Sequence, residues 1–217
     1  MLIMQHLSQW EDLHELVDAL ATALDAKNPF MCGHSERVAG TALLLAQEMG
    51  VCSAMQAVIH IGAHLHDIGK IGVPDHVLNK PGKLTEAEFV MIRQHPAIGG
   101  NILSKIKILR PVIDIVRHHH ERCDGKGYPD GLSGGDFSLG ARIVAVADAF
   151  DAMTSARPYR PALPLGAALR EMRRCRGSQF DPAVVDALAA LNPKNLIQSP
   201  GGRDMTCRPV DVISCCQ

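Results

Sequence analysis

Histidine and aspartate supply the side chains that point most directly to chemistry in this sequence. Eleven of its 217 residues are histidine, where average composition gives about half as many. His66 and Asp67 are adjacent, and the spacing of apolar residues before them predicts a position late in a helix. A carboxylate has two oxygens and can bridge two metal ions, whereas an imidazole supplies one nitrogen. Taken alone, such a pair is more often a surface or helix-capping pair than a metal site.

Further candidate ligands on other predicted helices strengthen the metal interpretation. They are His34, His95, His119, His120 and Asp148. Imidazole and carboxylate ligands suit Fe, Mn, Zn or Ni. Two such ions about 3.5–4 Å apart can polarise a phosphate and generate a hydroxide nucleophile. Ligands from several helices are what a site within a helical core requires.

Helices are expected to position these side chains, and we predict an all-α fold. Thr85 and Glu88 have the spacing of a capping box, Ser53 is a predicted N-cap, and Asp181 precedes a proline at the first position of a last short helix. Pro96 is expected to break one helix. The predicted helices cover about 10–27, 35–49, 53–68, 85–103, 109–119, 139–153 and 165–175.

One compact domain is expected over residues 1–190, with residues 1–9 as a flexible lead-in. Residues 191–217 lack periodicity, and we expect this tail to be loosely packed or disordered. Between residues 124 and 136 glycine recurs at five positions. Long loops of this kind are often functional.

Composition excludes several classes of protein. Hydrophobic residues make up 47% and the formal net charge is −1, which is not the basic footprint of a DNA-binding protein. We find no apolar run long enough to span a membrane and no signal peptide. The seven cysteines are odd in number and lack a CxxC pair, so reduced thiols and a cytoplasmic location are expected.

The ordered set of motifs resembles the HD-GYP subgroup of the HD-domain phosphohydrolases. The resemblance covers roughly residues 10 to 190 and includes Ala141–Ile143 and Asp148. The other matching stretches are Gly33–Val38, His66–Gly72, Lys80–Thr85, His95–Pro96, His119–Arg122, Asp124–Pro129, Gly131–Leu132, Asp151–Ser155 and Arg157–Arg160.

This resemblance implies a compact helical HD-domain bundle that hydrolyses cyclic di-GMP, a bacterial second messenger, to pGpG by a metal-bridging hydroxide. Whether pGpG is then cleaved to GMP stays open. The resemblance implies two divalent ions, Fe or Mn first, with Zn, Ni or Mg as alternatives. One ion would be held by His34, His66, Asp67 and Asp148, and the other by His95, His119, His120 and the bridging Asp67.

The resemblance also implies roles beyond the metal ligands. Asp67 and Lys70 would act in catalysis, with Lys70 on the scissile phosphate. Substrate binding would involve Lys70, Tyr128, Asp151, Arg157 and Arg160. The glutamate that holds a third metal in some members is replaced by Phe30, which favours two ions. Glu121 and Arg142 are expected to support neighbouring groups.

Several alternatives stay open. The chain could be a cyclic di-GMP receptor without turnover, or an HD hydrolase of another nucleotide such as cyclic GMP-AMP. The Gly125–Gly135 loop could contact a diguanylate cyclase (GGDEF) or a sensory domain, and a homodimer is compatible with the sequence. His60 and His64 could bind a metal on one helix face, but we interpret them as packing residues and His14 as a surface residue.

Overall fold

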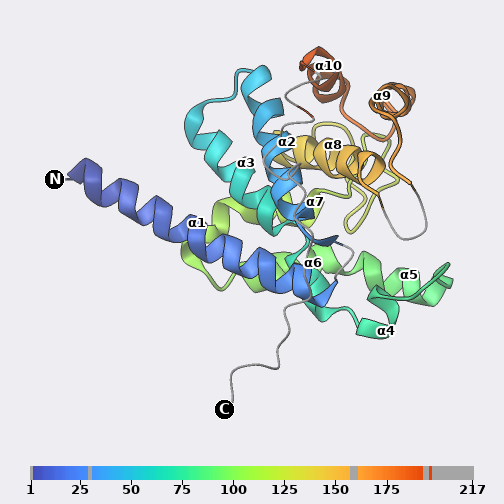
Figure 1. Ribbon diagram of the computed structural model, residues 1–217, viewed down its shortest axis with the longest axis horizontal. Coiled ribbons are helices and arrows are strands. Elements are labelled where there is room, and N and C mark those ends of the chain that lie inside the picture. Colours follow the sequence, from blue (N-terminus) through green and yellow to red (C-terminus); the bar gives the residue numbers. More distant parts are fainter. Residues whose placement is uncertain (1, 29–30, 157–160, 193–195, 197–217) are drawn as a thin grey trace.

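The computed structural model describes residues 2–28, 31–156, 161–192 and 196, and their regular structure is helical (Figure 1). Apart from an isolated bridge between Arg176 and Phe180, these residues contain no β structure. The all-α prediction is confirmed. The elements are α1 (Leu2–Lys27), α2 (His34–Glu48), α3 (Ser53–Leu65), η2 (Ile68–Gly72), α4 (Asp75–Leu78), α5 (Glu86–Arg93), α6 (His95–Leu103), η3 (Lys107–Val112), α7 (Ile113–His118), α8 (Leu139–Thr154), α9 (Leu165–Arg174) and α10 (Pro182–Ala190).

Helix α3 lies at the centre of the bundle because it is apolar on two faces. Ile59 and Ala63 belong to a core cluster with residues of α2, α8 and α10. Ile61 and Leu65 belong to a second cluster with α1, η3 and residues near α6 and α7. Residues four apart lie on the same face of a helix, so each pair feeds one cluster. The C-terminal end of α3 is thereby fixed between two packed layers, and the residues that follow it are held rigidly.

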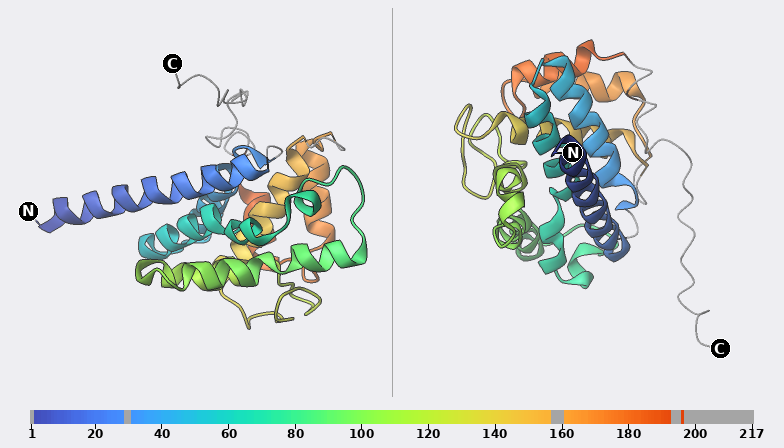
Figure 2. Two further views of the ribbon diagram at one scale, coloured as in Figure 1. Left: turned by 90° about the horizontal axis from the view of Figure 1, so that it is seen from below. Right: turned by 90° about the vertical axis from the view of Figure 1, so that its left-hand side faces the viewer.

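Helix α1 is longer than the sequence predicts. It begins at Leu2 rather than near Trp10, so residues 2–9 are helical where a flexible lead-in is predicted. These residues contain no glycine or proline to stop the helix. The N-terminal part of α1 extends away from the other helices (Figure 2).

At the C-terminal end of α1, Lys27 joins this helix to η2. Lys27 Nζ donates to the carbonyl oxygens of Ile71, at 2.7 Å, and Val73, at 2.9 Å. The Asn79 side chain donates to the Lys27 carbonyl at 3.2 Å. These bonds fix the end of α1 beside the segment that follows α3.

The other predicted elements are found with small shifts at their ends. The predicted break near Pro96 separates α5 from α6, and Asp181 caps α10 through the backbone N–H groups of Ala183 and Val184. The predicted cap at Ser53 is wrong, because Cys52 occupies the N-cap position and makes no side-chain cap bond. Most of the predicted tail lies outside the described residues.

Two further findings concern the membrane and the cysteines. No helix among the described residues is both long and apolar enough to cross a membrane. Cys52, Cys123 and Cys175 carry free thiols.

The Thr85 capping box provides a test of local stability. Thr85→Ala removes the acceptor of the Glu88 N–H at 3.3 Å and breaks the reciprocal pair, so the free energy of unfolding should fall by about 1 kcal/mol. Ser53→Ala is the matched control, because this serine makes no cap bond, and it should change stability by less than about 0.5 kcal/mol. Urea unfolding measures both, and equal losses would contradict the assignment of the caps.

Candidate metal centre

Seven side chains predicted as metal ligands converge at the end of α3. They form two groups, and within each group the possible ligand atoms lie within 4.8 Å of one another. One group contains Asp67, His95, His119 and His120, and the other contains His34, His66 and Asp148. The structure therefore brings together all the residues that the sequence predicts as ligands.

Asp67 lies between the two groups and presents one oxygen to each. Its Oδ1 is 3.1 Å from His95 Nε2 in the first group. Its Oδ2 is 3.3 Å from His66 Nε2 and 3.9 Å from His34 Nε2 in the second. A carboxylate placed in this way has the geometry to bridge two cations.

The helices place these ligands at their ends, where a side chain can reach the centre of the bundle. His34 is the first residue of α2, and Gly33 before it adopts a left-handed conformation with φ of 66°. His95 is the first residue of α6. His66 and Asp67 follow α3, and His119 and His120 follow α7. Only Asp148 comes from the interior of a helix, α8.

Backbone carbonyls orient three of the histidine rings. The Nδ1 atoms of His66, His95 and His119 lie 2.6, 2.8 and 2.8 Å from the carbonyl oxygens of residues three positions earlier. A ring that donates its Nδ1–H to a carbonyl leaves the lone pair of Nε2 free for a metal. All three rings can therefore offer Nε2 to a metal ion at the centre.

A carboxylate performs the same task for His34. Its Nδ1 lies 2.7 Å from Asp151 Oδ2, and Arg37 Nε donates to Asp151 Oδ1 at 2.6 Å. Ser155 also donates to Asp151. Burial alone lowers the pKa of His34, but the neighbouring carboxylates of Asp148 and Asp151 raise it to about 9. Asp151, predicted as a substrate-binding residue, lies buried behind His34 with both oxygens engaged, which favours a role in positioning that ring.

Electrostatics keep the carboxylates at the centre ionised. Burial raises the pKa of Asp67, but Lys70 and His66 lower it well below its usual value. Lys70 Nζ lies 2.5 Å from Asp67 Oδ2. The pKa of Asp148 is likewise lowered, since its interaction with the neighbouring His34 outweighs burial. Burial lowers the pKa of His120 to about 3, so this ring is neutral and can donate its lone pair.

The residues present fit a pair of divalent cations. The Nε2 atoms of His34 and His66 are buried and have no hydrogen-bond partner among the described residues. Buried polar atoms are normally paired, and these two instead face carboxylate oxygens of Asp148 and Asp67, each at 3.3 Å. A set of imidazole nitrogens with shared carboxylates matches borderline divalent metals.

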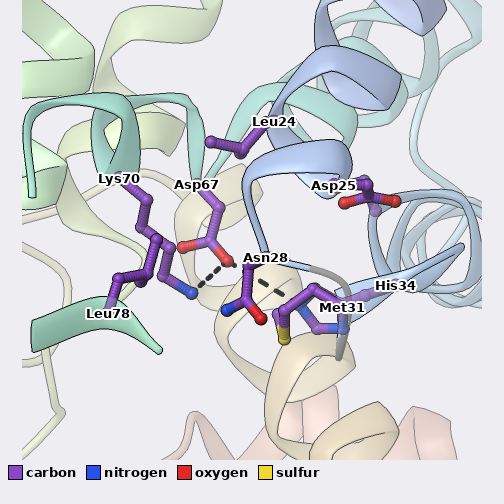
Figure 3. A pocket seen from close by; sticks show the side chains of 9 residues that line it. Leu24, Asp25, Asn28, Met31, His34, Asp67, Lys70 and Leu78 are labelled. Carbon is purple, nitrogen blue, oxygen red and sulfur yellow. Dashed lines mark hydrogen bonds and ion pairs between the residues drawn. The ribbon is translucent and has the colours of Figure 1, made fainter. Parts of the chain in front are cut away.

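A small cavity opens beside the centre, between the end of α1 and η2. Figure 3 shows Lys70 and His34 approaching Asp67 from opposite sides. The empty space of this cavity, including its mouth, is about 250 Å³. It is lined by Leu24, Asp25, Asn28, Met31, His34, Ser35, Asp67, Lys70 and Leu78. The end of α1 therefore forms one wall of the site.

On the other side of the centre, Tyr128 and Arg93 form a rim. The Tyr128 ring packs 4.8 Å from the ring of His120, and burial raises the pKa of its hydroxyl. The Arg93 guanidinium lies 4.4 Å from the Phe89 ring and 5.5 Å from the Tyr128 ring. Arg157 and Arg160, predicted to bind substrate, and Phe30 lie outside the described residues.

Glu121 anchors the glycine-rich loop that carries Tyr128. This carboxylate is buried and accepts three backbone N–H groups, from Asp130 at 2.7 Å, Gly131 at 3.0 Å and Leu132 at 3.1 Å. Arg142 has a different supporting role, because it forms an ion pair of 2.6 Å with Asp181 at the start of α10. Each of these two residues, for which the sequence predicts a supporting role, therefore has an identified partner.

Sequence reasoning missed several contributors to the site. Arg37 lies within the Gly33–Val38 stretch, but nothing in that stretch identifies Asp151 as its partner. Asp25 and Arg93 belong to none of the motifs. Asp25 accepts the Gly33 N–H at 2.9 Å, and burial raises its pKa. These residues come close to the centre through tertiary packing, so no spacing in the sequence could identify them.

Comparison with known proteins agrees with this geometry. Residues 18–184 match the family described as HD domain. The chain belongs to the HD domain family. Its motifs place it in the HD-GYP subgroup, so the resemblance seen in the sequence is confirmed.

Two relatives of this HD domain illustrate the range of the family. The cyclic di-GMP phosphodiesterase response regulator RpfG of Xanthomonas campestris is 46% identical over 80% of this chain and 47% of its own length. The 3′3′-cGAMP-specific phosphodiesterase 3 of Vibrio cholerae is 41% identical over 88% of this chain and 42% of its own length. The chain thus spans about half the length of these relatives.

A solved structure supports the fold of this HD domain. The cyclic GMP-AMP specific phosphodiesterase V-cGAP3 of Vibrio cholerae superimposes with a TM-score of 0.53 at 37% identity. The match covers 82% of this chain and 41% of that one.

Gly69 determines how closely His95 approaches Asp67. An ideal Cβ at Gly69 would lie 1.9 Å from the His95 carbonyl oxygen and 2.5 Å from the Gly99 nitrogen. Both contacts are with backbone, so α6 would have to move away from η2. The metal ligand at the start of α6 therefore depends on a residue without a side chain.

We expect Gly69→Ala to lower the free energy of unfolding by about 3 kcal/mol and to weaken metal uptake. Gly100→Ala on α6 is the matched control, since its Cβ would meet side chains at an ordinary 3.6 Å. Helix propensity should make this control neutral or stabilising by up to about 1 kcal/mol. Urea unfolding and metal analysis measure the two effects. Normal stability and metal content in Gly69→Ala would refute the close approach.

Proposed function

We propose that this chain is a metal-dependent phosphodiesterase that hydrolyses cyclic di-GMP at a centre of two divalent ions. The observation that carries the proposal is Asp67, whose two oxygens face two separate groups of buried ligands. The names of relatives such as RpfG support the substrate. Fe or Mn are the proposed ions, because histidine-rich sites with carboxylates accept them readily.

In the proposed assignment, Asp67 is shared by both ions. His34, His66 and Asp148 complete one set of ligands, and His95, His119 and His120 complete the other. When bound, such a pair of ions polarises a phosphate and lowers the pKa of water to supply the nucleophile. The protein contributes rings with fixed orientation and ionised carboxylates.

We also assign substrate roles to Lys70 and Tyr128. The Lys70 ammonium lies beside Asp67, where its charge would stabilise the negative charge that develops on the scissile phosphate. Tyr128 keeps its proton, because burial raises its pKa, and so it can donate a hydrogen bond. We further propose that Arg157 and Arg160 bind the second phosphate or the guanine edges, as guanidinium groups do well.

Two results would establish the reaction. Anaerobically purified protein supplied with Mn²⁺ or Fe²⁺ should convert cyclic di-GMP to pGpG or GMP, as followed by chromatography. The double variant His66→Ala/Asp67→Ala should lose more than about 100-fold of this activity, because removing ligands exceeds the effect of removing their supporting partners. His76→Ala, an exposed histidine on α4, is the control and should retain activity. Equal activity in the double variant and the control would refute the proposal.

Cyclic GMP-AMP is the second candidate substrate. It is favoured by relatives from Vibrio cholerae whose names specify 3′3′-cGAMP, one of them 41% identical to this chain. Parallel reactions on the two cyclic dinucleotides give their kcat/KM values. A higher value for cyclic di-GMP supports the main proposal, a higher value for the hybrid supports the alternative, and binding without turnover of either indicates a receptor.

A further inference from the structure

A third group of histidines lies on the opposite side of α3 from the proposed catalytic centre. Helices α1 and α3 pack side by side (Figure 1). His60 and His64 are four residues apart on α3, and His14 and Asp18 are four residues apart on α1. Each pair therefore lies on one face of its helix. The ligand atoms of the three histidines lie within 4.8 Å of one another.

We propose that His14, His60 and His64 bind a zinc-class divalent cation that clips α1 to α3. The Nε2 atoms of His14 and His60 face each other at 3.0 Å. In a tetrahedral zinc site with Zn–N bonds of about 2.0–2.1 Å, neighbouring nitrogens are about 3.3 Å apart. A small rotation of the two rings therefore suffices to place an ion between them. The His60 and His64 rings meet edge to face with centroids 4.7 Å apart.

The Asp18 carboxylate lies beside two of the three rings. Its Oδ2 lies 3.1 Å from His14 Nδ1, and its Oδ1 lies 3.4 Å from His64 Nδ1. Small rotations of the rings would let this carboxylate accept their Nδ1–H groups, which would leave the Nε2 lone pairs for a metal. We therefore assign Asp18 a supporting role for both of these ligands. A fourth position stays open to water, as three protein ligands allow.

The site is accessible and is separate from the catalytic centre. The side chains of His14 and Asp18 are 43% and 47% exposed, whereas His64 is buried, so an ion can enter from the α1 side. His64 and His66 are two residues apart, and residues at this spacing point to different sides of a helix. His66 faces Asp67, and His64 faces α1.

A cation bound by His14, His60 and His64 would also affect a wall of the cavity beside the proposed catalytic centre. Leu24 and Asp25 in the last turn of the same helix α1, and Asn28 directly after it, line the cavity beside His34 and Asp67 (Figure 3). A cation that holds α1 against α3 would fix the register of this wall.

Zinc uptake by the full chain tests this proposal without reference to activity. The Asp67→Ala variant lacks the shared catalytic ligand. Titration of this variant with Zn²⁺ should still show one ion per chain bound by His14, His60 and His64. Adding His14→Ala should remove that ion, whereas adding His76→Ala should not. His14 is partly exposed, so its replacement should not prevent folding, and circular dichroism checks this.

The Asp18→Ala variant distinguishes a residue that supports the ligands from a residue that binds the ion itself. Asp18→Ala should weaken zinc binding by about 10- to 100-fold, because it removes only the group that orients the rings. Zinc should also raise the Tm of the Asp67→Ala protein and not that of Asp67→Ala/His14→Ala. Identical zinc uptake in these two proteins, or no zinc bound by either, would overturn the proposal. Neither result depends on whether cyclic di-GMP is hydrolysed.

Discussion

The arrangement of this protein depends on a buried carboxylate that is surrounded by buried imidazoles. Asp67 is 3% exposed, and His34, His66, His95 and His119 around it are each 2% exposed or less. Taking so many polar groups out of water is unfavourable unless they find partners. Lys70 compensates part of the charge of Asp67, and backbone carbonyls satisfy the outer nitrogen of three rings. The inner nitrogens are left facing one another across Asp67, which is an arrangement that cations stabilise.

The packing of the helices follows from the need to hold this centre. Helix α3 is apolar on two faces and ends at His66 and Asp67, so both core clusters fix the position of these residues. Gly69 lets α6 approach closely enough for His95 to reach Asp67. Lys27 ties the end of α1 to η2. The supporting contacts are thus distributed over segments that are far apart in the sequence.

Local features of the fold could be predicted from the sequence, because they depend on neighbouring residues. The Thr85 capping box, the cap at Asp181 and the break at Pro96 are of this kind. The candidate ligand set follows from the motifs, and the structure brings all seven residues together. The predicted cap at Ser53 was wrong because Cys52, one residue earlier, adopts the extended conformation of the cap.

Features that depend on tertiary packing could not be predicted in this way. Asp151 carries the residue type of a substrate ligand, but it lies behind His34 and holds that ring. The grouping of His14 with His60 and His64 depends on the register between α1 and α3, which no spacing within one helix specifies. The same is true of the contact between Glu121 and the loop at residues 130–132.

Anomalous X-ray scattering from crystals of the full chain grown with Mn²⁺ shows whether two ions share Asp67. We expect two manganese peaks about 3.5–4 Å apart, one on each side of Asp67, with His34 beside one and His95 beside the other. A single peak, or two peaks on the same side of Asp67, would contradict the sharing of Asp67.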